Sequence, residues 1–411
     1  MAAAGRADVL RSKIQTQGTL VAELKKNKAT LSELEAAVKQ LGLFKEELRS
    51  LVDAERAKDL GGKEAAEKIR TGLENLMVQR FFVIPSFEIY GGVAGLYDFG
   101  PPGCAIRDNV IALWKRHFVL EEGMLEIFTS ALTPEIVLKT SGHVDRFTDL
   151  MVKDVKTGEC FRADKLLEEV IDNLLEDINI TDSERKEHLA NRSKAGDLNA
   201  AQMDDMIKRY DAKSLKGNEL SPAFPFNLMF ETPIGPSGKL RGFMRPETAQ
   251  GIFTNFKRLL EYNNSRMPFA GAQIGPAFRN EISPRAGLLR VREFTLAEIE
   301  HFVHPNDKSH PKFASVADIA MTLLDKSRQG KGTDEPLRIS AGEAVKAGLI
   351  NNETLAYFMV RTQLFLTKIG IKFELLRFRQ HKDTEMAHYA SDCWDAEIKS
   401  SYVSLLCFSS S

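Results

Sequence analysis

The stretch FRNEISPRAGLLRVREFTLAEIEHF, residues 278–302, decides the fold and the chemistry expected of this chain. The alternation of its side chains predicts a strand that carries Arg279 and Glu281 on one face. A basic loop follows, and a returning strand then carries an aromatic ring and several carboxylates. The loop contributes Arg285, Arg290 and Arg292, and the returning strand contributes Glu293, Phe294, Glu298 and Glu300. Two antiparallel strands joined by an arginine-rich loop are therefore predicted.

The chemistry of these side chains suits a nucleoside triphosphate. Arginine binds phosphate through paired hydrogen bonds, an aromatic ring stacks on a base, and a carboxylate accepts a hydrogen bond from the adenine amine. The same residues also fit a simpler interpretation, in which two surface strands are joined by cross-strand ion pairs. The residues by themselves leave both interpretations open.

The segments around this pair predict more short strands and one long helix. PFNLMF, GFMRPETAQG, FAGAQIGPAFRNEI and LLRVREFTLAEIEHFVHP alternate and are punctuated by proline and glycine, as strands of an antiparallel sheet are. Apolar residues at helical spacing predict a helix over 353–368, and IKFELLRFRQH and HYASDCWDAEI are typical of strands. The order of elements predicts an α+β protein and argues against the repeating βαβ order of a Rossmann sheet.

Upstream, the spacing predicts a helix over 105–120 that buries Trp114 and Phe118, and a strand, MLEIFTSALTP, that ends at Pro134. The glycine-rich run before this helix lacks the spacing of a phosphate-binding loop and indicates tight turns. Two polar segments, about 151–216 and 306–350, are predicted to be helical insertions between strands.

The N-terminal block, residues 6–62, predicts two helices joined by the turn NKAT, with a linker at Gly61 and Gly62. Residues 1–28 hold six basic and two acidic side chains, a charge of +4. The block is interpreted either as an amphipathic hairpin with a solvated charged face or as a small appendage that binds RNA or a protein partner.

Composition excludes several classes of protein. The chain has 411 residues, a net charge of −1 and 43% hydrophobic residues, so it is neither a histone-like cation nor disordered, and two to three domains are expected. Its four cysteines form no C-x-x-C pair, so neither a zinc ribbon nor a disulfide framework is indicated, and Cys393 is interpreted as a packed core thiol. No apolar run is long enough for a membrane span. A cytoplasmic protein is expected, with a mitochondrial one as the alternative.

Several motifs together resemble one enzyme family. FRNE, the arginine-rich loop and REF resemble motif 2 of the class II aminoacyl-tRNA synthetases, and the helix from Ala105 with the strand ending at Pro134 resembles motif 1. RPETAQGIF, SFEIYGGVAGLYDFGPPG, EMAHYA and DCWDAEIKSSY are similar to segments of the glycyl-tRNA synthetases of eukaryotes. The N-terminal hairpin resembles their WHEP appendage. The resemblance covers about 9–402, with the catalytic core over 72–402.

The resemblance implies a class II antiparallel sheet flanked by helices, with the hairpin and helical insertions attached. It implies a glycine–tRNA ligase that adenylates glycine with ATP and Mg²⁺ and then transfers it to the 3′ end of tRNA(Gly), as a homodimer. Glycine is small enough to be selected by steric exclusion, so no editing domain is required.

The resemblance also assigns roles to individual residues. Arg279 and Glu281 are the implied catalytic residues. Glu247 and Glu298 are the implied glycine-binding carboxylates. The implied ATP site consists of Arg279, Asn280, Glu281, Arg290, Val291, Phe294, Glu397 and Ile398, in which Phe294 stacks on adenine, Arg290 reaches the γ-phosphate and Glu397 holds Mg²⁺ through ATP.

The resemblance ends near Tyr402. The tail over 403–411, VSLLCFSSS, diverges from the family pattern. Motif 3, which would supply further glycine and ATP contacts, does not follow. A C-terminally truncated form is expected, whose tail can pair as a short edge strand. Two hypotheses follow, an active glycine–tRNA ligase and a catalytically inactive module that binds RNA or protein and dimerises.

Overall fold

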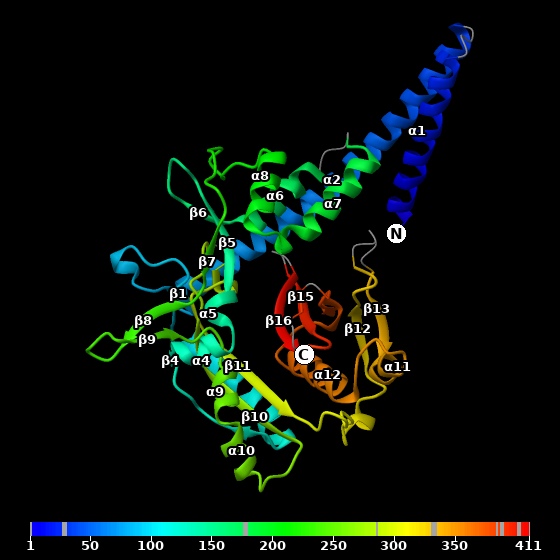
Figure 1. Ribbon diagram of the computed structural model, residues 1–411. Helices are drawn as coiled ribbons and strands as arrows, with labels where there is room; N and C mark the ends of the chain where they lie inside the picture. Colours follow the sequence, from blue (N-terminus) through cyan, green and yellow to red (C-terminus); the bar gives the residue numbers. More distant parts are fainter. Residues whose placement is uncertain are drawn as a thin grey trace. The chain divides into compact units, whose positions relative to one another are not determined.

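The computed structural model describes residues 2–26, 31–175, 180–284, 287–329, 335–383, 385–386, 390–400 and 404–410 (Figure 1). The chain divides into two compact units, residues 1–76 and 77–411. Within the described residues, no helix is both long enough and apolar enough to cross a membrane.

The first unit is built from α1 (Ala2–Lys26) and all but the last three residues of α2 (Leu31–Gln79). Leu10, Val21 and Ala37 are buried in it. The predicted hairpin is present, but the predicted linker at Gly61 and Gly62 is wrong, because both residues lie inside α2. Each glycine costs a helix about 1 kcal/mol relative to alanine, and the alanine-, glutamate- and lysine-rich flanks supply strong helix formers on both sides. The predicted NKAT turn, residues 27–30, lies outside the described residues.

In the second unit, the predicted antiparallel pair is formed by β10 (Phe269–Phe278) and β11 (Glu293–Phe302). The register pairs Phe269 with Phe302 and Ala277 with Phe294. Strand β3 (Leu125–Glu126) adds to β10 in the parallel direction. β10 carries alanine and glycine where α9 (Ala249–Thr254) and α10 (Phe256–Tyr262) pack closely against the pair.

The C-terminal part of the chain forms a five-stranded sheet with the strand order β13–β12–β14–β15–β16. Its strands are β12 (Ala320–Leu324), β13 (Leu337–Ser340), β14 (Leu376–Gln380), β15 (Trp394–Lys399) and β16 (Ser404–Ser410). Helix α12 has the predicted bounds, Glu353–Lys368, and packs against this sheet with α11 (Ala341–Lys346) nearby. The prediction of a helical insertion over 306–350 is wrong, because β12 and β13 belong to the sheet. The tail pairs with β15 as the edge strand β16, as predicted.

The helix predicted over 105–120 is α3 (Pro101–Trp114), which continues as the π-helical turn η2 (Lys115–Leu120). Trp114 and Phe118 are buried and their rings lie 5.4 Å apart. Phe118 also packs against Phe365 of α12, with ring centroids 5.7 Å apart. These two aromatic side chains therefore belong to the core of the chain itself and offer no surface for a second copy.

The predicted strand ending at Pro134 is instead two short strands in different sheets. β3 joins β10, whereas β4 (Leu132–Pro134) pairs with β9 (Leu240–Met244), which also pairs with β8 (Phe230–Ile234). Between β3 and β4, the backbone and hydroxyl of Thr129 donate to the buried Gln273 side chain. The chain is therefore held at Thr129 by a side chain and leaves the strand ladder.

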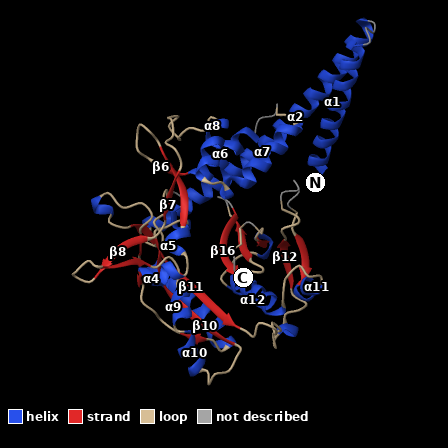
Figure 2. Cartoon of the chain, viewed as in Figure 1, coloured by secondary structure: helices blue, strands red, loops and turns tan. Residues whose placement is uncertain are grey.

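The insertion over 151–216 is largely helical, as predicted, and Figure 2 shows its helices beside a small sheet. The helices are α6 (Ala163–Leu175), α7 (Asp182–Lys194), α8 (Ala200–Arg209) and the turn η3 (Ala195–Asp197). The sheet consists of β5 (Thr148–Lys153), β6 (Cys160–Arg162) and β7 (Phe224–Asn227). Leu167, Ile171 and Met203 form a separate small core there.

The remaining elements are short. They are β1 (Val83–Pro85), η1 (Glu88–Tyr90), β2 (Tyr97–Phe99), α4 (Glu135–Thr140), α5 (His143–Arg146), η4 (Gly287–Leu289), η5 (Phe313–Ser315) and η6 (Phe373–Leu375).

Candidate active site

A cavity of about 1800 Å³ lies over β11 and extends toward α12 and β15. Its lining includes Glu247, Arg279, Phe294, Glu298, Glu300 and Ile398. Five of the residues implied by the resemblance therefore meet in one cavity. Asn280, Glu281, Arg290, Val291 and Glu397 are not among the described residues that line it. The volume exceeds the 300–1,000 Å³ typical of small-molecule pockets and leaves room for more than one ligand.

Glu298 is held in this cavity by one residue, Thr248. The backbone N–H of Thr248 donates to Glu298 Oε2 over 2.6 Å, and the Thr248 hydroxyl donates to the same oxygen. Burial raises the pKa of Glu298, and the nearby Glu247 carboxylate adds to the rise. Across the ladder, the Gln273 side chain donates to the Thr248 carbonyl over 2.9 Å and fixes that residue in turn.

Glu247 lies beside Glu298 and has different partners. Gln250 Nε2 donates to Glu247 Oε1 over 2.6 Å, and His143 Nε2 lies 3.2 Å from the same oxygen. Burial raises the pKa of Glu247, but the contacts with His143 and Gln250, together with Arg279, outweigh it and leave the pKa below its usual range. The two neighbouring carboxyls thus have pKa values shifted in opposite directions, a feature typical of functional sites.

A third carboxyl in the cavity belongs to Glu300, for which the sequence assigned no role. Burial raises its pKa to about 8, and the charges of Glu298 and Glu247 contribute. The side chain makes no hydrogen bond or ion pair with any other residue that the structure describes. Its spacing of two from Glu298 on a strand is the signal that places both carboxyls on one face.

Arg279 lies between two aromatic rings. Its guanidinium carbon is 5.6 Å from the centre of the Phe147 ring and 5.4 Å from that of Phe294, and its Nε donates to the Pro246 carbonyl over 3.3 Å. These contacts hold the guanidinium over aromatic faces, an arrangement that arginine favours. One face of the Phe294 ring, predicted to stack on adenine, is therefore in contact with Arg279.

The prediction that Arg279 and Glu281 lie on a strand is wrong. β10 ends at Phe278, and although the Arg279 N–H still donates to Arg292, the Asn280 N–H turns away and donates to the Leu228 carbonyl over 2.7 Å. Asn280 and Glu281 therefore lie in the loop. Glu281 faces Arg290 there, with 3.7 Å between Oε2 and Nε. Val291 is half-buried, and Arg285 lies outside the described residues.

Arg292 fastens this loop to the segment that precedes β2. Its Nη1 donates to the Ala94 carbonyl over 2.7 Å, its Nη2 to the Glu281 carbonyl over 3.0 Å, and its backbone N–H to the Gly95 carbonyl over 2.7 Å. Gly95 has a φ of +77°, and an added Cβ would lie 2.9 Å from Pro284. A side chain at position 95 would therefore disturb the contact that Arg292 makes.

Arg245, in the RPET segment, is a second positioning residue that the sequence did not reveal. It is buried, and it donates to the Pro276 carbonyl over 2.8 Å and to the Thr129 carbonyl over 3.0 Å. Burial lowers its pKa, and only Glu298 opposes this effect. Gly275 provides the space, since a Cβ there would lie 2.1 Å from Arg245 Nη2.

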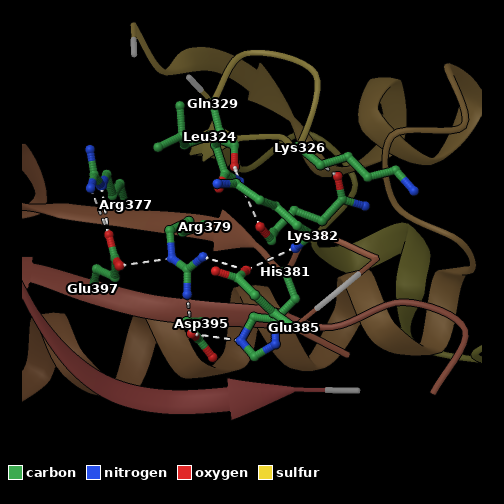
Figure 3. A network of polar contacts seen from close by, with 11 residues as sticks. Leu324, Lys326, Gln329, Arg377, Arg379, His381, Lys382, Glu385, Asp395 and Glu397 are labelled. Carbon is green, nitrogen blue, oxygen red and sulfur yellow. Dashed lines mark hydrogen bonds and ion pairs between the residues drawn. The ribbon is translucent and has the colours of Figure 1, made fainter. Parts of the chain in front are cut away.

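Glu397 and Ile398 point to opposite faces of β15. Ile398 lines the cavity, whereas Glu397 contacts two arginines of β14 (Figure 3). Arg377 Nε donates to Glu397 Oε2 over 2.8 Å, and Arg379 Nε donates to Oε1 over 3.0 Å. Both oxygens are engaged, so the predicted role of Glu397 as a Mg²⁺ ligand does not fit this arrangement.

Comparisons with known proteins agree on one family. Residues 238–328 match the family described as tRNA synthetase class II core domain (G, H, P, S and T). A glycine–tRNA ligase of Drosophila melanogaster is 51% identical over 402 residues, which cover 96% of this chain and 51% of the fly protein. A putative cytoplasmic glycine–tRNA ligase of Arabidopsis thaliana is 49% identical over 83% of this chain and 74% of the plant protein. The chain spans about half the length of the fly relative.

Among solved structures, a Giardia lamblia prolyl-tRNA synthetase with prolyl-adenylate is 13% identical, with a TM-score of 0.42 over 81% of this chain and 42% of that one.

Proposed function

Because the chain belongs to the glycine–tRNA ligase family, we propose that its cavity binds glycine and ATP for the adenylation of glycine and its transfer to the 3′ end of tRNA(Gly). The observation that carries this proposal is the convergence of Glu247 and Glu298 beside Arg279 in one cavity. Two carboxylates attract the ammonium group of an amino acid, and a guanidinium attracts a carboxylate or a phosphate. The two carboxylates thus suit the ammonium group of glycine, and the guanidinium suits the glycine carboxylate or the α-phosphate of ATP, the groups that must meet in adenylation.

The different pKa values of the two carboxyls support separate tasks. Glu247, with its lowered pKa, stays ionised and supplies the anion for the ammonium group. Glu298, held by Thr248, has a fixed position and fills space that a larger substrate side chain would need. We infer that glycine is selected over alanine by this steric limit, which is worth about 1–3 kcal/mol per methyl group.

ATP is proposed to lie over Phe294, with its phosphates toward Arg279. Arg279 covers one face of the Phe294 ring, so adenine stacking on that face would require the guanidinium to leave the ring and turn to the α-phosphate. Asn280, Glu281, Arg290 and Val291 lie in the loop that would meet the rest of the nucleotide, with Glu281 near the adenine amine and Arg290 near the γ-phosphate. Mg²⁺ is proposed as the counterion of ATP, without a role for Glu397.

The wider setting is also part of the proposal. tRNA(Gly) is the proposed partner, and the basic α1 helix, which ends in Lys25 and Lys26, is proposed to contact it as a WHEP-like appendage. We propose a homodimer in the cytoplasm. Its interface must use surfaces other than Trp114 and Phe118, because both are buried in the core of the chain.

One observation favours a second candidate, a binding module without ligase activity. Both oxygens of Glu397 accept hydrogen bonds from arginine, so this carboxylate is not free to hold a metal in the conformation described. Such a module would bind glycine or tRNA without forming an adenylate.

The test combines binding and turnover in the 411-residue chain. Calorimetry with glycine, alanine and ATP measures the ligands directly, and glycine-dependent exchange of pyrophosphate into ATP measures adenylation. Glu247→Gln, which removes the anion proposed for the ammonium group, should weaken glycine binding, whereas Glu293→Gln, an exposed change on β11, should not. Binding without exchange would support the second candidate. The absence of glycine and ATP binding in a folded chain would overturn both ligand assignments.

A further inference from the structure

Strands β14 and β15 place two rows of polar side chains opposite each other. The register pairs Arg377 with Glu397 and Arg379 with Asp395. One step beyond the strand pair, the backbone N–H of His381 donates to the Cys393 carbonyl over 2.9 Å. Alternation thus aligns one row of Arg377, Arg379 and His381 with a second row of Glu397, Asp395 and Cys393. Figure 3 shows the two arginines and His381 facing Glu397 and Asp395.

The first part of this ladder is a set of satisfied ion pairs. Arg379 Nη2 donates to Asp395 Oδ2 over 3.1 Å, and its Nη1 donates to Glu385 Oε2 over 2.9 Å. Together with the two contacts to Glu397, these bonds pair both arginines with carboxylates of the described residues. They require no ligand.

The end of the ladder, at His381, Cys393 and Asp395, combines an imidazole, a thiol and a carboxylate, and it includes a carboxylate oxygen without a partner among the described residues. His381 Nε2 lies 2.7 Å from Asp395 Oδ2, and the Cys393 side chain also contacts this imidazole. Asp395 is 4% exposed and Cys393 7% exposed. The second carboxylate oxygen, Asp395 Oδ1, is buried and has no hydrogen-bond partner among the described residues. A buried carboxylate oxygen without a partner is costly, and its presence beside a thiol and an imidazole indicates a missing ligand.

We propose that His381, Cys393 and Asp395 form a binding site for a zinc-class divalent cation. The three donor atoms, one each of nitrogen, sulfur and oxygen, lie within 4.8 Å of one another. Zinc binds these three kinds of ligand, commonly in a tetrahedron whose bonds of about 2.0–2.3 Å set donors roughly 3.3–3.7 Å apart. The imidazole and the carboxylate must therefore separate slightly to admit the ion.

The chemistry selects the metal class. A thiolate and an imidazole favour zinc and its relatives, whereas Mg²⁺ and Ca²⁺ prefer oxygen ligands and gain little from sulfur. Three protein ligands leave the fourth tetrahedral position to water. The site lies on the side of β15 that carries Glu397, opposite the Ile398 side chain that lines the cavity, so it is distinct from the proposed glycine and ATP site.

The charges of the neighbouring groups are compatible with a dication. Arg377 and Arg379 face the carboxylates of Glu397, Asp395 and Glu385. The formal charges of these five side chains sum to −1. A thiolate at Cys393 brings the sum to −2, which one divalent cation neutralises. Binding therefore replaces the proton now held between His381 and Asp395 and releases the proton of the Cys393 thiol.

The experiment uses the full 411-residue chain, purified with a chelator and then dialysed free of it. In a background with Cys104→Ser, Cys160→Ser and Cys407→Ser, Cys393 is the one remaining thiol, so its signal is unambiguous. Co²⁺ is the spectroscopic probe, because thiolate coordination gives a charge-transfer band in the near ultraviolet and tetrahedral geometry gives visible bands. Zn²⁺ is the competitor, and Mg²⁺ is the negative control.

We expect one Co²⁺ per chain with both sets of bands, displaced by one equivalent of Zn²⁺ and unaffected by excess Mg²⁺. Cys393→Ser should remove the charge-transfer band and weaken Zn²⁺ binding by more than the roughly 10–100-fold that loss of an outer ligand partner costs. His304→Ala is the matched histidine control and should change nothing. Circular dichroism of each variant separates lost binding from lost folding.

Two results would overturn the proposal. One is a folded chain that gives no thiolate-to-cobalt band. The other is Zn²⁺ binding that persists unchanged in folded Cys393→Ser. Because neither readout depends on glycine, ATP or tRNA, a failure here leaves the proposed function untouched.

Discussion

Thr248 fixes Glu298 through two donors that converge on one oxygen. Its backbone N–H donates to Glu298 Oε2 over 2.6 Å, and its hydroxyl donates to the same atom. Burial raises the pKa of Glu298, while both bonds from Thr248 lower it. The position and the charge of a proposed glycine ligand therefore depend on a neighbour that does not itself need to touch the substrate.

Thr248→Val should weaken glycine binding without unfolding the chain. The substitution retains the shape and the backbone donor but removes the hydroxyl, whose hydrogen bond to a charged group is worth about 1.5–3 kcal/mol, or roughly 10–150-fold. Calorimetric titration with glycine measures the change. Thr367→Val is the matched control, because its exposed hydroxyl donates to the Gln363 carbonyl within helix α12 and does not line the cavity. Equal glycine affinities in the two variants would contradict the role given to Thr248.

Arg279→Ala should weaken ATP binding, because the guanidinium is the proposed contact to the α-phosphate. A charge-assisted pair of this kind is worth about 1.5–3 kcal/mol, so a loss of roughly 10–150-fold is expected. Arg279→Lys should recover part of the loss, since lysine keeps the charge but not the paired donors. Fluorescence of a bound ATP analogue provides the measurement, with the exposed Arg258→Ala as control. Undiminished ATP binding by Arg279→Ala would rule out this contact.

The sequence predicted those parts of the fold in which one periodicity runs over a long segment. Alternation identified the β10–β11 pair, and helical spacing predicted α12 with its bounds at Glu353 and Lys368. The prediction of a helical insertion over 306–350 was wrong because β12 and β13 are strands of five and four residues beside the short helix α11. Strands this short leave little periodic signal, and their place in the sheet depends on distant partners.

The site was predictable where neighbours in sequence are also neighbours in space. Glu298 and Phe294 share strand β11, and both line the cavity. Glu397 could not be placed in this way, because its partners are Arg377 and Arg379, and only the register of β14 against β15 brings them together. For the same reason no sequence pattern indicated that Phe147, which follows α5, lies against the Arg279 guanidinium.

Glu300 should make the stability of the chain fall as pH rises from about 4.5 to 8. Its pKa is about 8 in the folded chain and lies near 4.5 when the side chain is exposed. Between these values the folded state holds a proton that the unfolded state has released, so each step upward in pH favours unfolding. At pH 7 the difference in pKa corresponds to about 3 kcal/mol.

Glu300→Gln should remove this pH dependence, because the amide cannot ionise. We expect the variant to exceed the parent in unfolding free energy by about 2–3 kcal/mol at pH 7 and to match it at pH 4. Urea denaturation at both pH values measures the difference. Glu293→Gln, on the exposed end of the same strand, should leave the parent profile unchanged. A parallel shift of the Glu300→Gln curve at both pH values would mean that packing, not ionisation, is responsible.

Arg292→Ala should destabilise the second unit by about 2–3 kcal/mol. The substitution removes two charged hydrogen bonds, to the carbonyls of Ala94 and Glu281, and leaves those carbonyls without their donors. Arg290→Ala is the control, because its ion pair with Glu281 spans 3.7 Å at a partly exposed position and is worth under about 1 kcal/mol. Denaturant midpoints for the two variants should therefore differ clearly. If Arg292→Ala is no less stable than Arg290→Ala, Arg292 does not fasten the loop.

The charge of α1 should appear in the salt dependence of tRNA binding. Lys25 and Lys26 close this helix and form part of the +4 charge of residues 1–28. If both contact phosphates, Lys25→Gln with Lys26→Gln should reduce the slope of log affinity against log salt by about 1.4–1.8, from roughly 0.7–0.9 per phosphate. Filter binding of tRNA at several salt concentrations measures the slope, and glycine affinity should stay the same. Lys39→Gln with Lys45→Gln, the same change in charge on α2, is the control and should lower the slope less. If both pairs lower it equally, the attraction comes from overall charge, and α1 is not the site of tRNA contact.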